Sequence, residues 1–131
     1  MKIKGAAVIY SIAVGIIMMA QWSFFLAFDQ VPEFEDEPIR ISFHIFAEFL
    51  TAVALIAGGL GLYLDKRWVF SLFLVAMGML SYTIVVSPGY YAERGELAFI
   101  LMFAVLWLIT AILVALALKK NFSLNDAYGV K

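Results

Sequence analysis

The chain has 131 residues, of which 65% are hydrophobic and 15% charged, with a formal net charge of −1 and no cysteine. A soluble domain of this composition would expose large apolar patches and aggregate, so the composition predicts an integral membrane protein. The balanced charge and the absence of a basic stripe exclude a nucleic-acid partner. The absence of cysteine excludes disulfides, thiolate metal sites and paired-thiol redox chemistry.

Four apolar runs predict four transmembrane helices, over residues 7–28, 41–64, 68–86 and 97–118. Each is close to the ~20 residues that a helix needs to cross a bilayer. The first run is too long for the apolar segment of a signal peptide, so we expect it to remain in the protein. Because the connections are short, the sequence predicts an all-α, up-down-up-down four-helix bundle that forms a single domain over residues 1–131 and has membrane lipids as partners.

The positions of the basic residues predict the orientation, because cytoplasmic segments carry an excess of lysine and arginine. One side of the predicted membrane protein holds Lys2, Lys4, Lys66, Arg67, Lys119, Lys120 and Lys131, and the other holds only Arg40 and Arg94. We therefore expect a multi-pass protein of the cell membrane with both termini in the cytoplasm. Its opposite side is acidic, with Asp29, Glu33, Glu35, Asp36, Glu37, Glu93 and Glu96.

Proline marks the connections on the acidic side. Pro32 and Pro38 flank the acidic segment 33–37, where they are expected to limit regular structure. The sequence Ser-Pro-Gly over residues 87–89 predicts a turn that ends the third transmembrane helix.

The second predicted helix contains His44, the only histidine, four residues before Glu48. This spacing places both side chains on one face of the helix. Counted from Ile41, Glu48 lies about 10 Å along the axis, too deep to reach water. A carboxylate at that depth costs a few kcal/mol unless it is paired, protonated or beside a polar cavity, so Glu48 is either functional or a packing contact between helices.

Other polar or aromatic residues in the same half of the membrane are candidate ligand contacts beside this pair. They are Gln21, Trp22, Asp29 and Tyr82, with Glu96 at the start of the fourth helix. Each also has a simpler structural role, such as bridging helices or lying in the interface. Trp107 and Thr110, near the middle of the fourth helix, are expected in the core.

Small residues repeat along the second helix at intervals of three and four, at Ala47, Thr51, Ala54, Gly58 and Gly61. Such a stripe allows another helix to approach closely. We expect the approaching helix to belong to the same bundle, and a homodimer is the alternative.

Three classes of function fit these observations. The first is a binding or transport module in which His44 and Glu48 handle a proton, a cation or a small ligand. A divalent metal is one candidate cation, although two side chains are fewer ligands than a metal site usually has. No other cofactor is expected. The second is a membrane enzyme acting on a lipid-like substrate, with His44 and Glu48 as acid and base. The third is a noncatalytic subunit of a larger membrane complex. We favour the first class over an enzyme.

Two partial resemblances are consistent with these alternatives. The size and the four spans resemble those of small multidrug transporters. Those proteins use a membrane-embedded glutamate in helix one, whereas the first predicted helix of this chain has no acidic residue before Asp29. Histidine followed four residues later by glutamate is similar to the acid and base placement in emopamil-binding sterol isomerases. That likeness covers two residues, and neither resemblance assigns a family.

Overall fold

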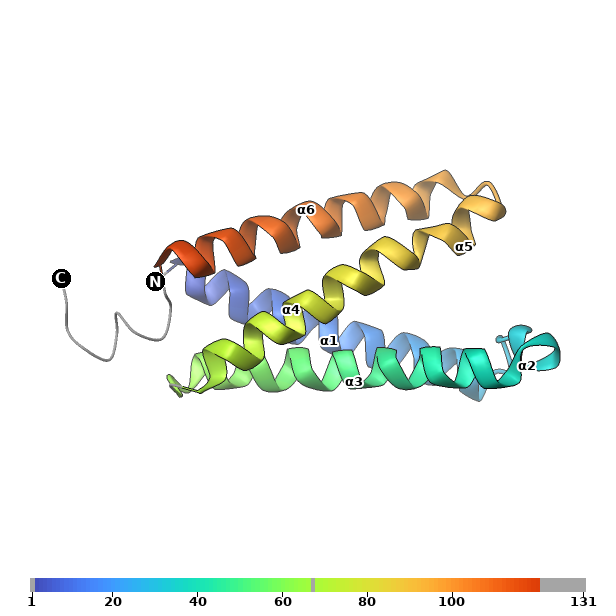
Figure 1. Ribbon diagram of the computed structural model, residues 1–131, viewed down its shortest axis with the longest axis horizontal. Helices are drawn as coiled ribbons and strands as arrows, with labels where there is room; N and C mark the ends of the chain where they lie inside the picture. Colours follow the sequence, from blue (N-terminus) through green and yellow to red (C-terminus); the bar gives the residue numbers. More distant parts are fainter. Residues whose placement is uncertain (1, 67, 121–131) are drawn as a thin grey trace.

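The computed structural model describes residues 2–66 and 68–120, and this part of the chain contains helices and no strand (Figure 1). The helices are α1 (Lys2–Ala27), α2 (Glu33–Asp36), α3 (Pro38–Tyr63), α4 (Val69–Val86), α5 (Pro88–Glu93) and α6 (Leu97–Lys120). Four segments are long and apolar enough to span a membrane, with mean hydropathies of 2.0 to 2.9. This confirms the predicted all-helical class with four candidate spans. Arg67 and Lys131, which contribute to the predicted orientation, lie outside the described residues.

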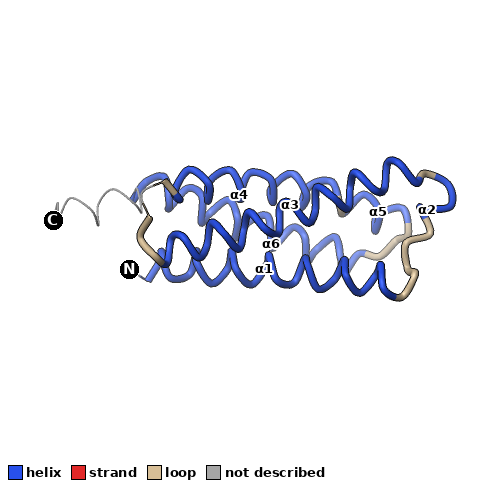
Figure 2. The backbone as a smooth tube through the Cα atoms, turned by 90° about the horizontal axis from the view of Figure 1, so that it is seen from below, coloured by secondary structure: helices blue, strands red, loops and turns tan. Residues whose placement is uncertain are grey.

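The long helices run alternately up and down the molecule (Figure 1). The start of α1, the turn between α3 and α4 and the end of α6 lie at one end, which we call the terminal end. The short helices α2 and α5 lie at the other, the α2–α5 end, and a view turned by 90° shows the same separation (Figure 2). Helix α3 packs against both α1 and α4, while α6 packs mainly against α4.

Three helices end with a residue in the left-handed conformation, which turns the chain sharply. Gly95 has φ 70° after α5, and Asp29 and Asp65 have φ 54° after α1 and α3. In each case the next amide donates back into the last helical turn; the Glu96 amide, for example, donates to the Tyr91 carbonyl at 2.9 Å. This is the hydrogen-bond pattern of a Schellman motif, which explains how such short connections reverse the chain.

Helix α4 ends at Val86, as predicted, but residues 87–89 do not form an open turn after it. Ser87 keeps helical angles, φ −60° and ψ −35°, and its amide donates to the Thr83 carbonyl at 2.9 Å. Pro88 then occupies the first turn of α5, where its fixed φ suits a helix and no amide is needed. The candidate span therefore continues from Val69 to Glu93.

The other predicted boundaries need smaller corrections. Helix α1 begins at Lys2 rather than residue 7, and α3 begins at Pro38 rather than residue 41. Pro38 begins a helix for the same reason as Pro88. The acidic segment 33–37, expected to lack regular structure, contains the single turn α2.

Close contacts between backbones hold α3 against its neighbours. A methyl group on Gly58 would lie 3.1 Å from the Cα atom of Phe73 in α4, and one on Gly59 would lie 3.3 Å from the carbonyl oxygen of Val8 in α1. Phe73 itself is fully buried. Gly58 of the predicted stripe, like its neighbour Gly59, therefore serves packing inside the bundle, which is the role preferred from the sequence.

Polar contacts also tie the helices together. The hydroxyl of Ser11 donates to the Leu55 carbonyl at 2.7 Å, linking α1 to α3. The hydroxyls of Tyr10 and Thr110 lie 2.8 Å apart, linking α1 to α6. Thr110 is fully buried, as expected, whereas Trp107 is 44% exposed and is not a core residue.

Candidate functional site

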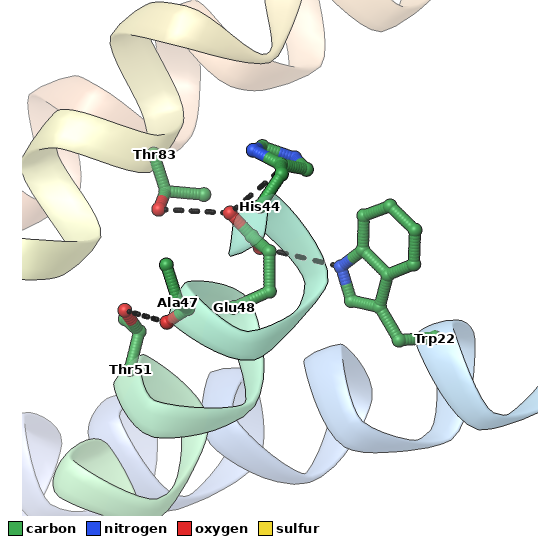
Figure 3. A network of polar contacts seen from close by, with 6 residues as sticks. All are labelled: Trp22, His44, Ala47, Glu48, Thr51 and Thr83. Carbon is green, nitrogen blue, oxygen red and sulfur yellow. Dashed lines mark hydrogen bonds and ion pairs between the residues drawn. The ribbon is translucent and has the colours of Figure 1, made fainter. Parts of the chain in front are cut away.

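Glu48 lies in α3 with its carboxyl group between three helices, and only 5% of the residue is exposed. The indole N–H of Trp22 in α1 donates to Oε2 at 3.3 Å, and the hydroxyl of Thr83 in α4 donates to Oε1 at 3.0 Å (Figure 3). Nε2 of His44, one turn earlier in α3, lies 3.9 Å from Oε1. We call Glu48 and these three neighbours the Glu48 site.

His44 is held from two sides at this site. Its ring makes an edge contact with the Trp22 ring, with 5.6 Å between centroids and 73° between planes. Its Nε2 atom lies near the Glu48 carboxyl group, an ion pair only when the imidazole is protonated. The side chain is 35% exposed, so His44 connects the buried carboxyl group with the surroundings.

A pocket of about 190 Å³ opens beside Glu48, between α3 and α4. Its lining comes from one face of each helix, at intervals of three and four residues: His44, Ala47, Glu48 and Thr51 in α3, and Met79, Tyr82, Thr83 and Val86 in α4. A larger hollow of about 440 Å³ between α4, α5 and α6 is lined by apolar and aromatic residues and contains no ionisable group. The Glu48 pocket thus combines a hollow with a titratable pair.

Glu48 lies further from the start of its helix than the sequence suggests, because α3 starts earlier than predicted. It follows Pro38 by ten residues, or about 15 Å along the axis of a helix about 39 Å long. The backbone of Glu48 is therefore within one helical turn of the middle of α3.

The structure brings together four of the residues predicted as ligand contacts and separates the others. Trp22, His44 and Glu48 form the site, and Tyr82 lines its pocket. Gln21 is exposed on α1 next to Trp22 but is not part of the pocket lining.

Asp29 and Glu96 are also outside the pocket lining. Asp29 is exposed in the left-handed position that ends α1. Glu96 follows Gly95, and its amide completes the motif that ends α5. Both acidic residues therefore lie in connections at the α2–α5 end.

Thr83 is a site residue that the sequence analysis does not predict. It is buried in an apolar helix and its hydroxyl is the closest donor to Glu48. Its only sequence signal is a hydroxyl within an apolar run, which is weak because such a group is often bonded to its own helix. Thr51, which the helical period places on the same face of α3 as His44 and Glu48, also lines the pocket.

Within residues 2–66 and 68–120, no group of three or more histidine, aspartate or glutamate side chains could hold a metal ion. His44 and Glu48 therefore remain a two-ligand set in the described part of the chain. The hypothesis of a divalent metal gains no further ligand from the fold and stays a prediction.

Comparison with curated proteins found no match, and comparison with solved structures found none either. A family model matches residues 1–128, which include all four candidate spans and the Glu48 site. The chain belongs to the family described as "Domain of unknown function (DUF8058)".

Proposed function

We propose that the protein is a multi-pass protein of the cell membrane in which one four-helix domain crosses the bilayer with both termini in the cytoplasm. The four candidate spans and their antiparallel order support this topology. The charges also support it: the terminal end holds Lys4, Lys66 and Lys119, and the α2–α5 end is rich in carboxylates.

Single cysteines test this topology directly, because the natural chain has none. Glu35→Cys places a thiol at the exposed turn α2, and Lys119→Cys places one at the exposed end of α6. In intact cells we expect a membrane-impermeant maleimide to label Glu35→Cys, and to label Lys119→Cys only after permeabilisation. The reverse pattern would contradict the orientation, and labelling of both in intact cells would contradict a position across the membrane.

Within this topology, we infer that the protein is a binding or transport module whose Glu48 site takes up one positive charge. The observation that carries this inference is a buried carboxyl group whose hydrogen-bond donors, Trp22 and Thr83, are both neutral. Neutral donors stabilise a carboxylate but leave its charge in an apolar environment, where an uncompensated charge is costly. The compensating charge is a proton, shared with His44, or the cationic group of a small ligand in the adjoining pocket.

Glu48→Gln tests this function because it removes the charge and keeps the size of the side chain. In proteoliposomes with a trapped pH-sensitive dye, we expect the natural protein to dissipate an imposed pH step and the variant to lose this flux. Native mass spectrometry of the same two proteins measures a bound cationic ligand. Glu93→Gln, which changes an exposed carboxyl group outside the site, serves as the control. Equal flux and equal bound mass in the natural and Glu48→Gln proteins would contradict the proposal.

A further inference from the structure

Two of the hydroxyl groups that line the Glu48 pocket, those of Thr51 and Thr83, have already used their protons inside the protein. Thr51 donates to the carbonyl of Ala47 at 2.8 Å, and Thr83 donates to Glu48 at 3.0 Å (Figure 3). A hydroxyl group has one proton and two lone pairs, so each threonine can still accept a hydrogen bond from a ligand but cannot donate one.

Glu48 adds further acceptor capacity at the same place. A carboxylate has about four lone-pair positions on its two oxygens. Trp22 and Thr83 each donate one hydrogen bond to it. The buried part of the pocket therefore has free acceptor positions on Glu48, Thr51 and Thr83, and the charged acceptor among them is Glu48.

The lining of the pocket changes from buried polar residues at its floor to more exposed residues at its mouth. Glu48, Thr51 and Thr83 are buried, whereas Val86 is 43% exposed and Tyr82 is 70% exposed. These exposed residues lie on the side of α4, well inside the candidate span Val69–Glu93. In the proposed topology the mouth faces the hydrocarbon region rather than water.

We propose that the ligand of this pocket is a primary ammonium ion carried on a small apolar group. Its three N–H donors match the free acceptors of Glu48, Thr51 and Thr83, and its apolar part lies against Met79, Tyr82 and Val86. A cavity of about 150 Å³ in a protein core is large enough for a benzene ring, so this pocket admits one ring or a short alkyl chain. The ligand enters sideways from the bilayer. This inference rests on the proposed function and specifies its ligand.

Three probes with one alkyl chain test the ligand class: hexylamine, hexyltrimethylammonium and hexanol. Isothermal titration of the detergent-solubilised protein measures each probe, and the same titration into detergent without protein gives the partition to be subtracted. Glu48→Gln is titrated in the same way as a variant. We expect hexylamine to bind at least roughly tenfold more tightly than the other two, because a hydrogen bond to a charged group contributes about 1.5–3 kcal/mol. Equal or tighter binding of the trimethylammonium probe would overturn the assignment to a primary ammonium ion.

Thr51→Val tests the role of the hydroxyl acceptors, since it keeps the shape and removes the lone pairs. Ser81→Ala is the matched control: Ser81 also donates to a carbonyl of its own helix, that of Met77 at 2.8 Å, but does not line the pocket. We expect Thr51→Val to weaken hexylamine binding roughly tenfold or more and Ser81→Ala to leave it unchanged.

The results separate this inference from the proposed function. If Thr51→Val and Ser81→Ala bind hexylamine equally well, the ligand assignment is wrong, while the loss of flux in Glu48→Gln would still support a site for a proton. If Glu48→Gln binds hexylamine as the natural protein does and also keeps the flux, both proposals fall. Melting temperatures of all the variants, measured in the same detergent, show whether a loss of binding reflects unfolding.

Discussion

Replacing Gly15 with alanine should lower the free energy of unfolding by about 1–3 kcal/mol, the usual cost of overpacking a tight contact. A methyl group at this position of α1 would lie 2.8 Å from the carbonyl oxygen of Ala52 and 2.8 Å from a side-chain carbon of Ile56, both in α3. The carbonyl oxygen belongs to a rigid helix and cannot move away alone. Helix α1 must therefore shift away from α3, which also pulls Trp22 from Glu48.

Gly78→Ala is the control for this substitution. Gly78 lies inside α4, and a methyl group there would meet nothing within 4 Å. Since alanine favours a helix over glycine, we expect Gly78→Ala to raise the free energy of unfolding by up to about 1 kcal/mol. Unfolding in mixed micelles of increasing SDS content, followed by circular dichroism, measures both variants. Equal stability of the two would mean that the contact at Gly15 relaxes at little cost.

The four long helices could be predicted because each is a continuous apolar run, and the pair of His44 and Glu48 could be found because it interrupts one. The sequence analysis did not predict that α5 would follow directly after α4, and this continuation has a physical cause. The sequence of residues 87–89 is typical of turns, but Ser87 keeps helical angles and its amide stays bonded to the Thr83 carbonyl, so the helical path continues. Proline in the first turn of α5 permits this continuation.

The composition of the Glu48 site could be predicted only in part, because it depends on how helices rotate against each other. Gln21 and Trp22 are adjacent, and adjacent residues of a helix point about 100° apart, so one can face α3 while the other is exposed. The sequence alone does not show which of the two side chains faces α3. Thr83 could not be predicted as a site residue for the same reason, because nothing in the sequence of α4 alone shows which of its faces meets Glu48.

Thr83→Val should lower the free energy of unfolding by about 1.5–3 kcal/mol in the natural protein and by about 0.5–1.5 kcal/mol in the Glu48→Gln background. Valine keeps the shape of the buried side chain and removes the donor that lies 3.0 Å from Oε1 of Glu48. Removing a hydrogen-bond donor lowers the free energy of unfolding more when its acceptor is a carboxylate than when its acceptor is a neutral amide. In the Glu48→Gln background the threonine hydroxyl can form a hydrogen bond with either the oxygen or the NH₂ group of the amide. A difference of about 1 kcal/mol between the two backgrounds therefore indicates a charged Glu48.

The same SDS titration applied to the natural protein, the two single variants and the double variant measures this coupling energy. Coupling near 1 kcal/mol indicates a charged Glu48 whose compensating proton is held outside the carboxyl group, and His44, with Nε2 3.9 Å from Oε1, is the ionisable neighbour there. A ligand cation would then replace that proton. Additive effects would contradict this and place the proton on Glu48 itself. A ligand cation would then have to displace that proton, so its binding would release one proton from the carboxyl group.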